Sequence, residues 1–318
     1  FETGLLDTLA MAQIRQGHFE FTGSVEAPQV AYITSLTAND AGIPLVLENT
    51  DFTVDIGTTV KIKGGPLQDI MNEFTALSEE LILKEREAQQ QMLVAQQEGN
   101  SMKAQAIQSQ FNKYLLEMQT RHTALLNKYS DTYVAAYLIM TNMTGVDLAQ
   151  IKAEYGLLGE NAKATLPGRT IATYIAAYEK IAVGNEAPDF TMGTADGLTL
   201  TLSEVKAKAK VVYFWVPAHQ PCRQENVNYL KLYKRFEKDG LTIIAVALQC
   251  NELEWKKAMS EDGIVWESGM DRDGNISRVY FAKTVPYNLL LDENNNIVAI
   301  NLQGSALQKK VAEMLKGK

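Results

Sequence analysis

The chain contains little cysteine: Cys222 and Cys250 are the only two among its 318 residues. Two thiols are too few for a disulfide-stabilised scaffold, so an apolar core has to hold the fold together. Hydrophobic residues make up 46% of the sequence, which is enough for a sizeable core. This length and composition predict a globular protein of two or three domains.

The chain also lacks runs of positive charge and long apolar stretches. Its formal net charge is -8 at pH 7, with acidic and basic residues mixed along the sequence, which argues against nucleic acid as a partner. No segment approaches the roughly 20 consecutive apolar residues of a membrane-spanning helix, and FETGLLDTLA at the start does not read as a signal peptide. A cytoplasmic location does not follow, because a secreted or lipid-anchored protein looks the same once its leader and anchor cysteine are removed.

Residues 1–65 read as short alternating segments bounded by Gly, Pro, Asn or Asp, and they predict a small β-rich domain. The segments expected to form strands are HFEFTGSV (18–25), QVAYITSL (29–36), IPLVLEN (43–49), FTVDIG (52–57) and TVKIKGG (59–65).

Residues 66–183 change to a helical period and predict an all-α domain with a long helical hairpin that turns at Gly99-Asn100. Shorter helices are expected to start at Ser130-Asp131, at Asp147 and beside Pro167. The apolar positions that carry the hairpin's period are Ile70, Phe74, Leu77, Leu81, Phe111, Leu115, Met118, His122, Leu125 and Tyr129. Because His122 lies on this stripe, we interpret it as a packing histidine.

Residues 184–318 alternate between strands and helices, which predicts a mixed sheet with helices on both faces. The expected strands are KVVYFW (210–215), LTIIAVAL (241–248) and a hairpin over 284–302; the expected helices are 226–240, 253–262 and 306–315.

Several motifs of this last zone occur in an order that resembles one family. They are APDF (187–190), DG (196–197) with LTLSEV (200–205), FW followed by a cysteine and Arg-x-Glu, and Val-Pro before LLLDENNNIV. Together they resemble the thioredoxin-like domain of extracytoplasmic thiol-disulfide oxidoreductases of the TlpA and ResA kind. The resemblance implies an α/β thioredoxin fold for 184–318, and the layout of the two preceding domains is similar to that of many Bacteroidetes proteins.

The segment FWVPAHQPCRQE (214–225) departs from the family at its reactive position. The family reads W-x-x-W-C-x-P-C-x-x-E there, and its two cysteines cycle between dithiol and disulfide. Here the first cysteine is replaced by His219 and the second is retained as Cys222, while Ala218 replaces a tryptophan. The lost position normally supplies the attacking thiolate at a helix N-terminus, so exchange through two motif cysteines is excluded.

Other features of the family's site are retained. Trp215, Pro221 and Glu225 match the tryptophan, proline and glutamate of the motif, and Val285-Pro286 matches the family's cis-proline. Tyr287 follows, where a small hydroxyl residue is often found. The resemblance therefore implies a groove with a binding role for these residues and a catalytic role for His219, Cys222 and Glu225.

The sequence leaves alternatives open for the chemistry of this site. Cys222 could act as a monothiol activated by His219, or pair with Cys250 in an unusual disulfide, or join His219 and Cys250 around a soft metal such as copper, the weakest of the three. Peroxiredoxin chemistry is set aside because that family has Thr or Ser where His219 stands. No cofactor and no resident metal are expected.

The alternative is a function of a different class, binding without redox activity. A thioredoxin-fold protein of this kind binds a peptide or partner, or acts as a scaffold, through the groove near Trp215 and Pro286. The expected partners are thus protein thiols or disulfides, or a partner peptide. The family resemblance places the protein in the cell envelope, periplasmic or outer-surface, where a lipid anchor outside the given chain is compatible with the sequence. The sequence does not define the oligomeric state.

Overall fold

The computed structural model describes residues 8–35, 42–143 and 146–316. The chain forms two compact units, residues 1–172 and 173–318, and each is described here by itself. The helix α6 (Leu166–Glu179) begins in the first unit and ends in the second.

The first unit contains two small antiparallel strand pairs. Their strands are β1 (Gln29–Ile33), β2 (Ile43–Leu47), β3 (Thr53–Ile56) and β4 (Val60–Lys63). The strand predicted for 18–25 is wrong: Phe19 and Phe21 alternate with polar residues, but the segment pairs with no other strand that the structure describes. Val25 instead donates its backbone N–H to the side chain of Asn49, at 2.8 Å.

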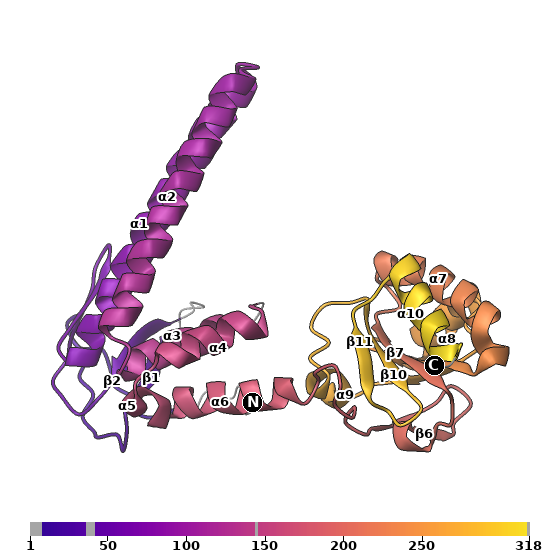
Figure 1. Ribbon diagram of the computed structural model, residues 1–318. Helices are drawn as coiled ribbons and strands as arrows, with labels where there is room; N and C mark the ends of the chain where they lie inside the picture. The colour runs from indigo at the N-terminus through magenta and orange to yellow at the C-terminus, as the bar shows by residue number, and fades with distance from the viewer. Residues whose placement is uncertain (1–7, 36–41, 144–145, 317–318) are drawn as a thin grey trace. The chain divides into compact units, whose positions relative to one another are not determined.

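The predicted helical hairpin is confirmed and makes up the long arm of this unit (Figure 1). Its helices α1 (Pro66–Gln97) and α2 (Ser101–Lys128) are joined by Gly99 in a left-handed conformation, and Asn100 caps α2 by accepting from the backbone of Lys103. Glu80 and Arg121 form an ion pair across the hairpin at 2.8 Å.

Shorter helices follow, and their caps differ in part from the prediction. They are α3 (Tyr133–Asn142), α4 (Leu148–Leu157) and α5 (Glu160–Ala164). Asp147 caps α4 as expected, but Thr132 and not Ser130-Asp131 caps α3. Asp131 reaches across the chain instead and accepts from the backbone N–H groups of Asn161 and Ala162 at the start of α5.

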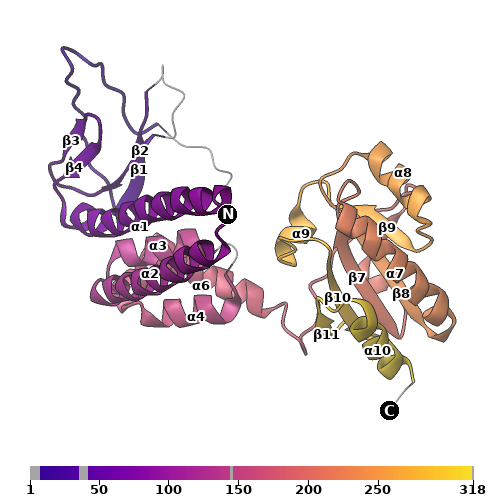
Figure 2. The same cartoon turned by 90° about the horizontal axis from the view of Figure 1, so that it is seen from above.

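The second unit contains a five-stranded mixed sheet with the order β11-β10-β7-β8-β9 (Figure 2). The strands are β7 (Ala209–Trp215), β8 (Leu241–Ala247), β9 (Glu267–Met270), β10 (Tyr287–Asp292) and β11 (Ile297–Ile300). β7, β8 and β9 run parallel, whereas β10 is antiparallel to both β7 and β11. The predicted mixed sheet is therefore confirmed, with β9 as an additional strand.

Helices cover both faces of this sheet, as expected. One core packs the odd-numbered side chains of β7 against α7 (Gln220–Phe236), α8 (Glu252–Asp262) and α10 (Gly304–Leu315). The other packs the even-numbered ones against α9 (Asn275–Val279) and the small hairpin of β5 (Thr191–Gly193) and β6 (Thr199–Thr201). In the part of the chain that the structure describes, no helix is long and apolar enough to cross a membrane.

Candidate functional site

The site is built where the buried strand β7 passes into α7. Every residue of β7 is buried, and the chain leaves it through Val216, whose carbonyl accepts from the N–H of His219 at 2.9 Å. The carbonyl of His219 in turn accepts from the N–H of Cys222 at 3.0 Å and so begins the helix. Pro221 lies in the first turn, where its missing N–H costs nothing. The sequence therefore places His219 at the N-cap and Cys222 inside the first turn.

The structure brings His219 and Cys222 together, with the thiol covered. The Nδ1 atom of His219 lies 3.3 Å from the Sγ of Cys222. The imidazole is exposed, whereas Cys222 is only 1% exposed. Burial raises the pKa of the Cys222 thiol, because the interior disfavours the thiolate. At neutral pH the site thus presents an imidazole to the solvent above a protonated thiol.

The Val285–Pro286 peptide bond is cis, as predicted from the family motif. Tyr287 begins β10 and pairs with Phe214 of β7, so the antiparallel register places Pro286 beside the end of β7 that carries Trp215. Val285, Pro286 and Tyr287 are all half-buried and keep some exposed surface. These residues and the start of α7 therefore lie together at the carboxyl end of β7.

Glu225 lies one turn after Cys222 on α7 and is half-buried. Its Oε2 accepts from Asn228 at 2.8 Å, while Oε1 is buried without a hydrogen-bond partner among the described residues. Nearby, burial raises the pKa of Tyr229, and the Glu225 carboxylate adds to that effect. One oxygen of the carboxylate is thus buried beside the site, and among the described residues no hydrogen bond joins it to Cys222.

An aromatic cluster that the sequence did not predict forms around Phe281, four residues before Val285. Phe281 packs against Tyr174 and Tyr178, with ring centroids 5.1 and 4.5 Å apart, and adopts an unusual left-handed backbone with φ of 52°. Lys283 donates to the hydroxyl of Tyr174 at 2.8 Å. The available sequence signal was the pair of tyrosines four residues apart in TIATYIAAYEK, which share one face of α6.

Cys250 follows the carboxyl end of β8, next to the end of β7, but forms no disulfide with Cys222. The backbone N–H of Leu248 donates to the carbonyl of Trp215 at 2.9 Å, so β8 ends beside β7 as predicted. Both cysteines are free, and the proposed disulfide does not form. The alternative metal site also finds no support, since the described residues contain no cluster of three or more histidine, cysteine or acidic side chains that could hold an ion.

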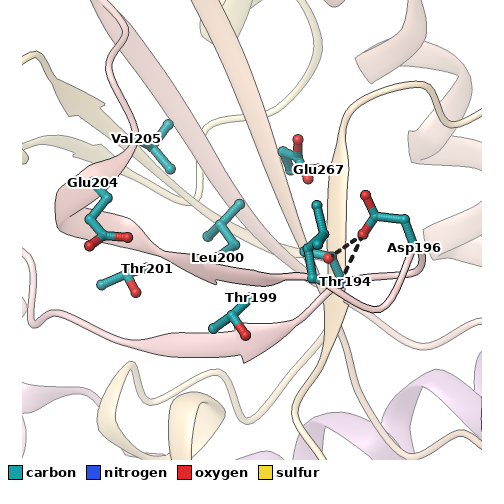
Figure 3. A pocket seen from close by; sticks show the side chains of 9 residues that line it. Thr194, Asp196, Thr199, Leu200, Thr201, Glu204, Val205 and Glu267 are labelled. Carbon is teal, nitrogen blue, oxygen red and sulfur yellow. Dashed lines mark hydrogen bonds between the residues drawn. The ribbon is translucent and has the colours of Figure 1, made fainter.

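A pocket of about 200 Å³ in the same unit does not coincide with this site (Figure 3). It lies between the β5–β6 hairpin and Glu267 of β9, and threonine and acidic side chains line much of it. Asp196 there accepts from Thr194 at 2.5 Å. None of the site residues predicted from the sequence lines this pocket.

Comparisons with known proteins identify relatives of the region that contains this site. Residues 183–300 match the AhpC/TSA family model, and residues 2–71 match that of a domain of unknown function, DUF4369. Thiol-disulfide oxidoreductase ResA from Bacillus cereus is 24% identical over 143 residues, which cover 45% of this chain and 82% of that protein. ResA from Geobacillus thermodenitrificans is 26% identical over 149 residues, covering 46% and 85%. The chain belongs to the TlpA/ResA-like proteins. Its carboxyl-terminal region has the thioredoxin fold.

Two of the solved structures similar to this TlpA/ResA-like chain come from Bacteroides. The thioredoxin domain of a thiol-disulfide oxidoreductase from Bacteroides vulgatus is 31% identical, covers 42% of this chain and 98% of its own, and has a TM-score of 0.41. A thiol:disulfide interchange protein from Bacteroides sp. is 32% identical, with 43% and 91% covered and a TM-score of 0.41. By its family match and its similarity to ResA proteins, the carboxyl-terminal region is thiol-disulfide oxidoreductase-like. The sequence excludes peroxiredoxin chemistry because His219 stands where that family has Thr or Ser, and this exclusion stays a prediction.

Proposed function

We propose that the thioredoxin-like domain binds an extended polypeptide in the groove between His219 and Pro286 and does not exchange disulfides through two motif thiols. The observation that carries this proposal is the burial of Cys222, 1% exposed, beneath the exposed His219. Dithiol exchange needs one thiolate to attack a partner's disulfide and a second thiol to release the product. A motif with one buried cysteine can complete neither step in this conformation.

The electrostatics of Cys222 support the same proposal. A helix N-terminus lowers the pKa of a thiol placed there, but desolvation acts in the opposite sense and dominates for Cys222, whose pKa is raised. His219 occupies the outer position instead and brings no nucleophilic sulfur. We therefore expect a weakly nucleophilic Cys222 at neutral pH.

The retained parts of the groove support a binding role. Val285, Pro286 and Tyr287 keep exposed apolar surface, against which an extended segment can pack. On this proposal the partner is a protein, recognised through its backbone and one or two apolar side chains. The proposed location is the cell envelope, periplasmic or outer-surface, and the similarity to ResA proteins supports this proposal.

A second candidate is monothiol chemistry, favoured by the 3.3 Å approach of His219 to the Cys222 sulfur. Here the imidazole accepts the thiol proton during a local opening, and the Cys222 thiolate attacks a disulfide of the partner. One new S–S bond forms, the partner's bond breaks, and one partner sulfur leaves as a thiolate. A further thiol from solution then has to release the mixed disulfide.

Alkylation of the purified protein separates the two candidates. In a Cys250→Ser background we expect Cys222 to react with iodoacetamide slowly in the native state and rapidly after unfolding. Fast native labelling with an apparent pKa well below ~8.5 would contradict the inert thiol and support monothiol chemistry.

Binding is tested with thiol-blocked insulin B chain as an extended probe. We expect its addition to shift the backbone amide signals of Val216, His219 and Val285. A titration that leaves these signals unchanged would overturn the binding proposal.

A further inference from the structure

The first unit contains a pocket of about 220 Å³ formed by residues of α2, α3, α4 and the segment before α4. Leu126 and Ile139 line it with buried side chains, and Leu138 and Val146 with half-buried ones. An apolar cavity of about 150 Å³ is enough to hold benzene. The pocket therefore has room and apolar surface for one ring or a branched aliphatic group.

Two ionisable side chains give this pocket its electrostatic character. His122 from α2 packs edge-on against Phe74, with centroids 5.5 Å apart, but its ring nitrogens make no hydrogen bond with any residue that the structure describes. Burial lowers the pKa of His122, and the charge of Glu154 opposes this only in part, so the ring is neutral at pH 7. His122 is thus a packing histidine, as predicted, but one whose polar atoms are not satisfied by packing.

Glu154 from α4 supplies the formal charge of the pocket. Its Oε1 accepts from Gln150 at 2.9 Å, and Oε2 has no hydrogen bond from another described residue. No lysine or arginine is among the lining residues, which include the exposed Asn142 and Gln150. The pocket therefore combines an apolar interior with one carboxylate and one neutral imidazole.

We propose that this pocket binds a small organic cation, a primary ammonium group attached to an aromatic ring or a branched aliphatic chain. The apolar body packs on Leu126, Leu138 and Ile139. The ammonium donates to the free oxygen of Glu154 and to an unprotonated nitrogen of His122, both of which accept hydrogen bonds only. The pocket residues lie outside residues 2–71 and 183–300, so neither matched family model accounts for the site.

The charge preference distinguishes this proposal from a merely apolar cavity. Benzylamine, benzyl alcohol and phenylacetate share one ring and differ in the charge of the attached group. The full chain, with methyl-labelled Leu, Ile and Val, is titrated with each compound and followed by NMR. We expect benzylamine to shift the methyl signals of Leu126, Leu138 and Ile139 with a dissociation constant of about 1 mM or below, about fivefold tighter than benzyl alcohol, and phenylacetate to bind most weakly.

Two variants locate the interaction. Glu154→Gln should remove the advantage of benzylamine over benzyl alcohol, whereas Glu117→Gln, an exposed glutamate on α2 outside the pocket, should preserve it. Leu138→Phe should fill the pocket and weaken both ligands at an unchanged melting temperature. Equal binding of all three compounds, an advantage that survives in Glu154→Gln, or unshifted methyl signals with benzylamine would each overturn the proposal.

Discussion

At the residue scale, the proposed loss of dithiol exchange depends on the residue at position 219. The His219 side chain already lies against the Cys222 sulfur, at 3.3 Å. His219→Cys should therefore place an exposed thiol at the helix N-terminus, where its pKa falls, with Cys222 as the resolving thiol. We expect this variant to reduce insulin in the presence of dithiothreitol at least about tenfold faster than the wild type, since an activated thiolate is then available at neutral pH.

The control for this prediction is His219→Ser, which removes the imidazole without adding a thiol. It should not accelerate insulin reduction. If His219→Cys folds and shows no gain either, the groove beside Pro286 does not accept a disulfide substrate.

Also at the residue scale, burial of Cys222 makes stability depend on pH. Its pKa is raised in the folded state, so the unfolded thiol loses its proton first as the pH rises above ~8.5. The free energy of unfolding then falls with pH, by at most about 1.4 kcal/mol per pH unit for this group, until the pH passes the folded pKa. Urea unfolding at pH 8 and pH 9.5 should show a larger loss for the wild type than for Cys222→Ala. Equal losses in the two proteins would mean that Cys222 ionises normally in the folded state.

At the element scale, the position of α7 on the sheet depends on a polar network that the sequence did not reveal. Arg223 donates to Asp262 of α8 at 2.6 Å, and Asn226 donates to the same oxygen while accepting from Tyr213. Asp262→Ala leaves Arg223 and Asn226 without this acceptor in a largely buried position. We expect the free energy of unfolding to fall by about 2 kcal/mol, measured by urea denaturation.

Glu261→Gln is the matched control for this change. Glu261 also accepts from Arg223, at 2.9 Å, but is half-exposed. Its loss should cost no more than about 0.5 kcal/mol. A similar effect of both substitutions would contradict a special role for Asp262.

The sequence predicted two kinds of element well: strands that are buried on both faces and therefore read as continuous apolar runs, and helices that are separated by a clear turn signal. KVVYFW and LTIIAVAL became β7 and β8, and Gly99-Asn100 divides the hairpin as expected. The sequence missed β9 because ESGM carries a glycine and little apolar character, and its place is set by pairing with β8. Likewise, Asp131 was expected to cap the next helix, but its carboxylate caps a helix about 30 residues further on, which no local signal could indicate.

In the candidate site, too, the sequence predicted local features and missed those that depend on residues far away along the chain. The motif identified His219, Cys222 and the cis peptide bond at Pro286, because their order along the chain carries the information. It could not indicate that Cys222 is covered, or that Tyr174 and Tyr178 support Phe281 from about 100 residues away. Both depend on tertiary packing.

At the scale of the whole molecule, the carboxyl-terminal unit begins before the segment that resembles the family. The sequence places the start of this domain at Gly184, but Tyr174, Tyr178 and Ile181 pack within the unit that starts at residue 173. Ile181 is 2% exposed, and burying one such side chain contributes about 1.5–3 kcal/mol. A polypeptide of residues 173–318 should thus be more stable than one of residues 184–318 by about 3 kcal/mol, with a higher urea midpoint. Equal midpoints would show that the domain is complete from Gly184 and that the aromatic cluster adds nothing to it.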